Sequence, residues 1–216
     1  LSNHAEYQRA EDDFIAWLEE TEGTDAAASA LYAKALVKIA KLRQLTAAGK
    51  MAAAYNWIEE FLESGEKLVV FAHHREVTRA LATKFQAPSI TGETAAKERQ
   101  AIVDSFQDNP SVRLLVCIIQ AGGEGITLSA ASNVAFVELA WTPTELDQCE
   151  DRVHRIGQSD SVNAWYLLAE NSVDTTMYNL ITQKREVVTA STDGKEGAEI
   201  KILTAILERY KEKKHG

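Results

Sequence analysis

Residues 67–85 read Lys-Leu-Val-Val-Phe-Ala-His-His-Arg-Glu-Val-Thr-Arg-Ala-Leu-Ala-Thr-Lys-Phe, and the change of hydrophobic period inside this stretch decides the fold. Leu68 to Phe71 is a short, unbroken apolar run, which is typical of a strand covered on both faces. The residues from about Arg75 to Phe85 then take the spacing of a helix. A buried strand that leads directly into a helix predicts the first step of an alternating α/β fold.

The same alternation continues along the chain. Strands that alternate with helices of ordinary length predict a doubly wound parallel sheet with right-handed crossovers, so the expected fold class is α/β. Nucleotide-handling domains often have this architecture, but a fold alone does not establish a function. We expect further strands at Ser89 and Ile90, 112–119, 134–139 and 164–169, and helices at 95–106, 143–156 and 174–188.

Helices are predicted on either side of the α/β region. Residues 1–62 read as helical throughout, including a separate helix over 55–62, which Gly65 ends. Residues 191–197 have the composition of a loop, and a last helix begins at about Ala198. We therefore expect an N-terminal helical extension over 1–62, the α/β lobe over 63–190, and a loop with a C-terminal helix over 191–216.

Composition leaves a nucleic-acid partner open. The formal net charge of the 216 residues is -9, which by itself argues against binding DNA. However, residues 1–25 carry eight acidic side chains and one basic side chain, so the rest of the chain is close to neutral. A local basic surface is compatible with that balance.

The sequence also indicates an intracellular protein with no membrane partner. Its longest aliphatic stretch, Leu114 to Ile119, is far shorter than a membrane span, and its start lacks the pattern of a secretory signal. Cys117 and Cys149 fall inside a predicted strand and a predicted helix, which favours buried thiols in a reducing compartment. The histidines and cysteines have no metal-ligand spacing, so we expect no metal site.

Residues 142–158 predict a helix with two distinct faces. Thr142 as N-cap, Pro143 at the first helical position and Glu145 three residues after the cap form a capping box, and Gly157 supplies the C-terminal stop. One face is an apolar stripe that should pack against the core: Leu146, Cys149, Val153 and Ile156.

The opposite face of this helix carries Gln148, Arg152 and Arg155. Two guanidinium groups one turn apart suit a phosphate or a developing phosphoryl charge, because arginine stays charged and binds phosphate oxygens in a planar fork. The alternative is a solvated face on which the arginines pair with nearby acids.

Three turns follow predicted strands, at the edge where ligands bind to open parallel sheets. They begin at His73, at Gln120 and at Trp141, and the second contains glycines that let backbone amides approach an anion. No phosphate-binding loop with its lysine and hydroxyl is present, and no acidic cluster follows a strand. The chain therefore reads as half of an active site.

The residues that carry a family resemblance are Leu68–His74, Thr91-Gly92, 121–128, Trp141-Thr142-Pro143 and above all 151–158, Asp-Arg-Val-His-Arg-Ile-Gly-Gln. They resemble the second RecA-like lobe of SWI/SNF-type DNA translocases in helicase superfamily two. The run Glu138-Leu139-Ala140-Trp141 is most similar to the subgroup of annealing helicases and fork remodellers.

The resemblance implies ATP-driven translocation on double-stranded or branched DNA. It implies that ATP and Mg2+ are held mainly by a first RecA-like lobe. It also implies that the protein is a monomer associated with DNA. Arg152 and Arg155 would reach the ATP with support from Gln148, Glu124 and Gly125 would couple nucleotide to DNA, and DNA contacts would come from Thr91, Gly92, Gln120, Ala121, Gly122 and Trp141.

The chain departs from the family pattern at Ile119, Thr127 and Thr142, which puts individual DNA contacts in doubt. We expect that this lobe alone does not hydrolyse ATP. Two rival interpretations are a docking domain derived from a helicase lobe, which would bind DNA or protein without catalysis, and a stand-alone nucleotide-binding enzyme.

Overall fold

The computed structural model of the chain describes residues 1–21, 28–122, 125–154, 161–188 and 195–212. These residues form two units, one of Leu1–Lys50 with Ala169–Gly216 and one of Met51–Leu168. The sheet lies wholly in the second unit. Among the described residues, no helix has the length and apolar character needed to span a bilayer.

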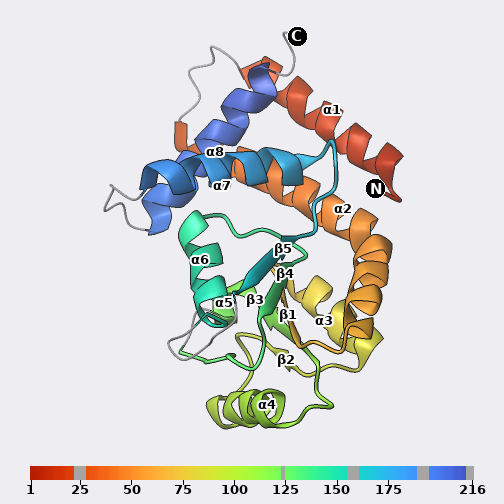
Figure 1. The fold of residues 1–216 in the computed structure, drawn as a ribbon. Helices are drawn as coiled ribbons and strands as arrows, with labels where there is room; N and C mark the ends of the chain where they lie inside the picture. The colour runs from red at the N-terminus through yellow and green to blue at the C-terminus, as the bar shows by residue number, and fades with distance from the viewer. Residues whose placement is uncertain (22–27, 123–124, 155–160, 189–194, 213–216) are drawn as a thin grey trace. The chain divides into compact units, whose positions relative to one another are not determined.

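One sheet of five parallel strands forms the centre of the second unit (Figure 1). Its spatial order is β2-β3-β1-β4-β5, so chain neighbours are joined by crossovers, as the predicted doubly wound α/β fold requires. That fold class is confirmed. The strands are β1 (Leu68–Ala72), β2 (Ser89–Ile90), β3 (Leu114–Ile118), β4 (Asn133–Phe136) and β5 (Asn163–Tyr166).

The helices of this unit follow the strands in alternation, and α3 and α6 lie on opposite sides of the sheet in Figure 1. Their bounds are α3 (Arg75–Phe85), α4 (Ala96–Asp108), α5 (Ile119–Gly122) and α6 (Pro143–Asp151). The helix expected at 75–85 is confirmed residue for residue. The third, fourth and fifth strands are shorter than expected, because the chain leaves the ladder and turns soon after Ile118, Phe136 and Tyr166.

The core of the sheet is apolar and aromatic. All residues of β1, β3 and β4 are buried, which explains why β1 and β3 are unbroken apolar runs rather than alternating ones. In β4 the buried Asn133 precedes three apolar residues. Phe71, Phe136 and Tyr166 occupy one register position on three neighbouring strands. Their rings stack, with centroids 5.5 Å and 5.1 Å apart. This stack joins β1, β4 and β5 just before the edge that carries the candidate site.

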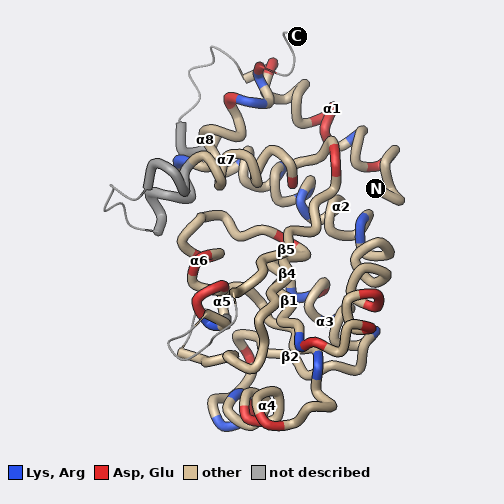
Figure 2. The backbone as a smooth tube through the Cα atoms, in the orientation of Figure 1, with Lys and Arg blue, Asp and Glu red and all other residues tan. Residues whose placement is uncertain are grey.

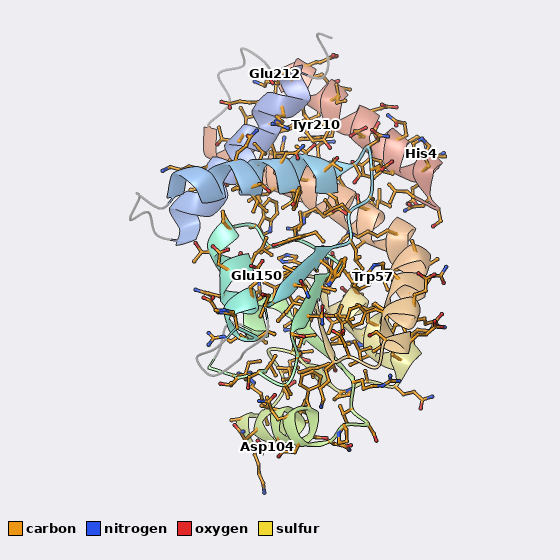
Figure 3. The ribbon with its side chains drawn as sticks, viewed as in Figure 1. His4, Trp57, Asp104, Glu150, Tyr210 and Glu212 are labelled. Carbon is orange, nitrogen blue, oxygen red and sulfur yellow. The ribbon has the colours of Figure 1, made fainter. Side chains whose placement is uncertain are left out.

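Four helices contribute to the first unit: α1 (His4–Thr21), the first part of α2 (Ala28–Glu63), α7 (Val173–Val188) and α8 (Lys195–Glu212). The acidic residues of the N-terminal segment are spread along α1 in Figure 2. Tyr7 of α1 and Tyr210 of α8 are buried, and their hydroxyl oxygens lie 3.5 Å apart. Tyr210 is labelled in Figure 3. The Tyr7 hydroxyl also accepts a 2.8 Å hydrogen bond from the amide of Val173.

Two sequence expectations in this region were wrong. The residues after Tyr55 do not form a separate helix, because α2 continues unbroken through Gly49. Glycine allows close packing there: a Cβ atom at Gly49 would lie 2.0 Å from Oδ1 of Asn3, so a larger residue would require the Asn3 side chain to move. The last helix begins at Lys195 rather than at Ala198.

Candidate functional site

The parallel sheet brings the predicted turns to one edge. All five strands run in the same direction, so their carboxyl ends meet there. Along the sheet, Thr91 follows β2, Gln120 follows β3, His73 follows β1, and the segment that reaches Trp141 follows β4. The predicted convergence of these turns is therefore a consequence of the strand order.

A buried carboxylate joins the ends of β1 and β4. Glu138 is only 4% exposed and accepts hydrogen bonds from the backbone amides of His73 and His74, at 2.9 Å and 2.8 Å. Its Oε1 lies 2.5 Å from Nδ1 of the His74 ring. Three contacts to one side chain hold the turn after β1 against the turn after β4.

The N-terminus of α6 is built as the sequence predicts. Thr142 is the N-cap, its hydroxyl oxygen accepts a hydrogen bond from the amide of Glu145 at 3.4 Å, and Pro143 stands at the first helical position. Leu146, Cys149 and Val153 are all at most 1% exposed, so the apolar stripe is confirmed over its described members. Ile156 and the predicted stop at Gly157 lie outside the described residues.

The C-terminus of α6 differs from the prediction. The helix ends at Asp151 instead of continuing to 156, and Arg152 is its C-cap. The ending has a physical cause: the carbonyl of Arg152 accepts a 2.8 Å hydrogen bond from the amide of Leu128, a residue of another segment. The last turn closes with shorter-range bonds instead, such as Val153 amide to Glu150 carbonyl at 3.0 Å.

The three residues predicted to face a phosphate, Gln148, Arg152 and Arg155, differ from one another in their surroundings. Arg152 is half-buried beside the end of α6, and Gln148 is exposed one turn earlier. Arg155 lies outside the described residues. The helix that carries them is also tied to the sheet, because the Tyr166 hydroxyl of β5 donates a 2.5 Å hydrogen bond to Glu150, which is labelled on α6 in Figure 3.

The segment after β3 begins as a helix, whereas we expected the strand to continue to Ile119 and to be followed directly by the glycine turn. Ile119 to Gly122 form the single helical turn α5. Gln120 is exposed, whereas Ala121 is 2% exposed, so any ligand contact of Ala121 would involve its backbone. Gly125 has a φ of +59°, a conformation that favours glycine. Glu124 lies outside the described residues.

The turn after β2 is organised by hydroxyl groups. The amide of Thr91 donates to the Thr94 hydroxyl at 2.9 Å, and the amide of Glu93 donates to the Thr91 hydroxyl at 3.3 Å. Gly92 is exposed at the tip, and Trp141 is half-buried in the segment before α6. The turn thus holds its backbone in one conformation beside the sheet edge.

The two cysteines are not suited to nucleophilic chemistry. Burial raises the pKa of the Cys117 thiol from 9.0 to about 12, and it also raises the pKa of the Cys149 thiol. Both groups stay protonated at neutral pH. In the described part of the chain, no three His, Cys, Asp or Glu side chains gather in a way that could hold a metal ion.

Sequence reasoning missed the structural roles of Glu138 and Tyr166. The sequence does contain a signal for Glu138: it is an acid inside the apolar run 134–140, and a carboxylate that is buried there requires hydrogen-bond partners. No local pattern identifies Tyr166 as the residue that anchors α6, since its partner Glu150 is 16 positions away.

Comparison of the amino-acid sequence with known proteins identifies a family and several relatives. Residues 50–157 match the family described as the helicase conserved C-terminal domain. The DNA annealing helicase and endonuclease ZRANB3 of Homo sapiens is 37% identical over 164 residues, which are 73% of this chain and 15% of that protein. The SWI/SNF-related matrix-associated actin-dependent regulator of chromatin subfamily A-like protein 1 of Xenopus laevis is 40% identical over 149 residues, 66% of this chain and 16% of that protein.

Solved structures agree with the sequence relatives. The SWI2/SNF2 ATPase core of Sulfolobus solfataricus in complex with double-stranded DNA superposes with a TM-score of 0.70 at 25% identity, covering 87% of this chain and 43% of that one. The chain thus spans about 15% of the length of the curated relatives that it matches and less than half of this structural neighbour.

Proposed function

Since this chain belongs to the helicase conserved C-terminal domain family and is a C-terminal SNF2-type lobe of a DNA-dependent ATPase, we propose that it is the second motor lobe of an ATP-driven double-stranded DNA translocase. In this proposal the lobe supplies arginine side chains to ATP bound on a first RecA-like lobe. It also supplies backbone and side-chain contacts to DNA.

The observation that carries the proposal is the way in which α6 is fixed. A capped N-terminus, three buried apolar side chains and the Tyr166–Glu150 hydrogen bond hold the helix rigidly. Its C-cap, Arg152, is fixed through its backbone carbonyl, which accepts the hydrogen bond from the Leu128 amide. The residue is half-buried, so it remains partly accessible to solvent. A preorganised guanidinium is what stabilisation of a transferring phosphoryl group requires, because positioning and charge supply most of that catalysis.

The described residues fit a supporting role toward the nucleotide and not a complete site. They include no group of three His, Cys, Asp or Glu side chains that could hold a metal ion. In our proposal, Mg2+ and the phosphate-binding loop belong to the first lobe. Gln148 and Arg155 would act beside Arg152, and Glu124 and Gly125 would link the nucleotide to the DNA. An isolated lobe of this kind would not turn over ATP.

We propose that double-stranded or branched DNA is the substrate along which the whole protein translocates. Support comes from the relatives: one is named an annealing helicase, and the structural neighbour holds double-stranded DNA. The contacts would come from turns along the carboxyl edge of the sheet, with Gly92 and Gln120 exposed and Trp141 half-buried. Thr91, Ala121 and Gly122 would contribute through their backbone, since the Thr91 hydroxyl already accepts the amide of Glu93 and the Ala121 side chain is buried.

The first experiment compares ATP hydrolysis by the 216-residue chain with hydrolysis by a protein that carries both lobes, each with duplex DNA. We expect multiple turnovers only from the two-lobe protein. Sustained hydrolysis by the 216-residue chain would contradict the proposal and favour a stand-alone enzyme. DNA binding by a two-lobe protein without any ATPase activity would instead favour the docking domain.

The second experiment replaces Arg152 in the two-lobe protein. Arg152→Ala should lower the ATPase rate by about a thousandfold or more, the range found for arginines that reach a transferring phosphoryl group, while duplex DNA affinity changes little. Arg152→Lys keeps the charge but loses the planar fork, so we expect a large part of the loss to remain. Arg113→Ala is a matched control: Arg113 is exposed and immediately precedes β3, at the end of the strand opposite to the candidate site. The rate of this variant should stay near the parent value.

A further inference from the structure

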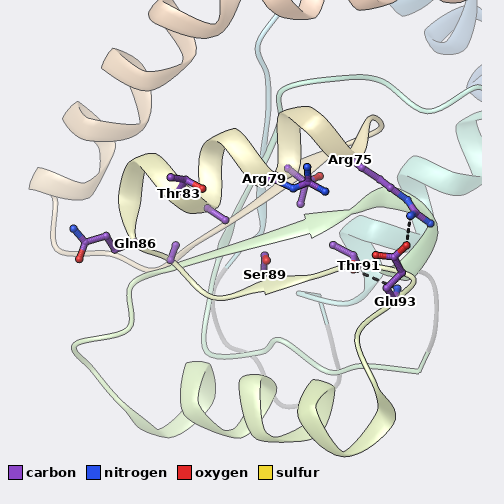
Figure 4. A pocket seen from close by; sticks show the side chains of 10 residues that line it. Arg75, Arg79, Thr83, Gln86, Ser89, Thr91 and Glu93 are labelled. Atoms are coloured by element: carbon purple, nitrogen blue, oxygen red, sulfur yellow. Dashed lines mark hydrogen bonds and ion pairs between the residues drawn. The ribbon is translucent and has the colours of Figure 1, made fainter.

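A polar groove runs between α3 and the edge strand β2. It has a volume of about 430 Å³, and its wall on one side is α3 and on the other β2 with the Thr91 turn (Figure 4). Its lining residues come from one continuous stretch of chain: Arg75, Thr78, Arg79, Ala82, Thr83, Gln86, Ala87, Ser89, Thr91 and Glu93. Because Thr91 lines it, the groove is continuous with the turn that we propose as a DNA contact.

Arg79 is the cation that this groove leaves available. Three basic side chains stand on α3, and two of them have partners: Arg75 pairs with Glu93, and Lys84 lies 2.8 Å from Glu59. Arg79 is exposed and makes no ion pair or hydrogen bond with any described residue. It lies one helical turn from Arg75, an arrangement of like charges that is unfavourable unless an anion lies nearby.

The remaining lining favours a phosphate over a base. It presents the hydroxyl groups of Thr83 and Ser89 and the side-chain amide of Gln86, which are groups that hydrogen-bond phosphate oxygens. None of the ten lining residues is aromatic, so a base would find no ring on which to stack. The groove therefore suits the backbone of a nucleic acid and is a poor site for a free nucleotide.

Glu93 is the only acid among the lining residues, and it pairs with Arg75. Its carboxylate holds Arg75 at the end of the groove nearest Thr91, as the dashed line in Figure 4 marks. Both side chains are more than half exposed, so their ion pair is weak. A phosphate that reached Arg75 could displace Glu93 at little cost.

We propose that the groove between α3 and β2 is an additional phosphate-binding surface for the DNA strand contacted by the Thr91–Gly92 turn, with Arg79 as its principal cation and Glu93 as a competitor for Arg75. This inference rests on the proposed function, because it extends the same DNA interface. The contact would be independent of base sequence, since phosphates carry no sequence information.

The test measures the affinity of the two-lobe protein for a duplex of random sequence as a function of salt. Arg79→Ala should weaken binding roughly threefold to tenfold near 0.1 M salt and lower the slope of log K against log salt by about one, the effect of losing a single phosphate contact. Arg79→Lys should keep most of the affinity, because a point charge still binds phosphate. Glu93→Gln should raise the affinity, since Arg75 is then released.

Lys84→Ala is the matched control. It removes the same charge from the same helix, but Lys84 lies outside the groove and is paired with Glu59. Its affinity should stay within about twofold of the parent protein, because a distant exposed charge is screened at this salt concentration.

The possible outcomes separate the two proposals. Equal losses of DNA affinity for Arg79→Ala and Lys84→Ala would mean that only net charge matters. That result would overturn the proposal that the groove binds phosphate. Unchanged binding by Arg79→Ala, in a protein that still binds duplex DNA and hydrolyses ATP, would overturn the groove and leave the proposed function intact. A two-lobe protein that does not bind duplex DNA at all would overturn both.

Discussion

The backbone amide of Leu128 donates a 2.8 Å hydrogen bond to the carbonyl oxygen of Arg152. Leu128 lies three residues after Gly125, and Arg152 is the C-cap of α6. The proposed coupling turn and the proposed phosphate-side arginine are therefore joined through the main chain. A shift of the turn would move the backbone that positions Arg152, and in the proposed function this hydrogen bond would help to couple DNA contact to the nucleotide.

The first prediction concerns Gly125. Its φ of +59° is unfavourable for a residue with a Cβ atom, while no heavy atom lies within 4 Å of the Cβ position. Gly125→Ala should thus act through the backbone alone and lower the free energy of unfolding by about 1–2 kcal/mol. We also expect the DNA stimulation of ATPase activity in the two-lobe protein to decrease.

Gly92→Ala is the matched control for this stability effect. Gly92 also has open space around its Cβ position, but its φ is not in the left-handed region. Urea unfolding followed by tryptophan fluorescence should show little change for Gly92→Ala. Equal destabilisation of both variants would contradict the backbone explanation.

A second prediction concerns Glu138. Glu138→Ala removes the acceptor of the His73 and His74 amides and leaves these partly buried donors unsatisfied. We expect a loss of about 2–4 kcal/mol in the free energy of unfolding, because each hydrogen bond to a charged group contributes about 1.5–3 kcal/mol. Glu138→Gln keeps an acceptor oxygen and should lose less. Glu60→Ala, an exposed site in the same unit, should lie within about 0.5 kcal/mol of the parent.

The anchor of α6 gives a third prediction. Tyr166→Phe deletes the hydroxyl that donates to Glu150 and keeps the ring stacked on Phe136. The unfolding free energy should decrease by about 1 kcal/mol. The ATPase rate of the two-lobe protein should also decrease, because Arg152 is then less firmly positioned. Tyr55→Phe serves as the control. If both variants had the same ATPase rate, the idea that Tyr166 positions Arg152 through α6 would be wrong.

The buried thiols give a prediction about pH. In the unfolded chain Cys117 has its ordinary pKa of 9.0, whereas in the folded chain burial raises the pKa to about 12. The stabilising effect of the protonated thiol is complete below pH 9 and is lost as the pH rises toward 12. At pH 10 we expect Cys117 to account for a decrease of about 1 kcal/mol in the free energy of unfolding relative to pH 8.

This pH effect can be isolated by comparing the parent chain with Cys117→Ser at both pH values in urea, since serine does not ionise in this range. A second readout is thiol labelling at pH 8: Cys117 and Cys149 are buried and should react only after unfolding. Rapid labelling of the native chain would show that the burial argument is wrong.

Local patterns in the sequence were sufficient for the elements of the α/β unit. Leu68–Ala72 and Leu114–Ile118 are apolar runs because parallel strands are covered on both faces, and this property is visible without coordinates. The cap at Thr142 and the stripe of Leu146, Cys149 and Val153 are also local, because they depend on residues three or four positions apart.

Contacts between distant residues decided the rest. The end of α6 at Asp151 depends on the amide of Leu128, and the anchoring of the β1 turn depends on Glu138, which is more than 60 positions away from it. Likewise, the glycine at position 49 of α2 is explained by the distant Asn3, whose side chain lies where a Cβ atom would stand. Hydrogen-bond partners of this kind come together only when the sheet forms, so periodicity and spacing predicted the elements, while the tertiary structure determined where they end and which side chains hold the site.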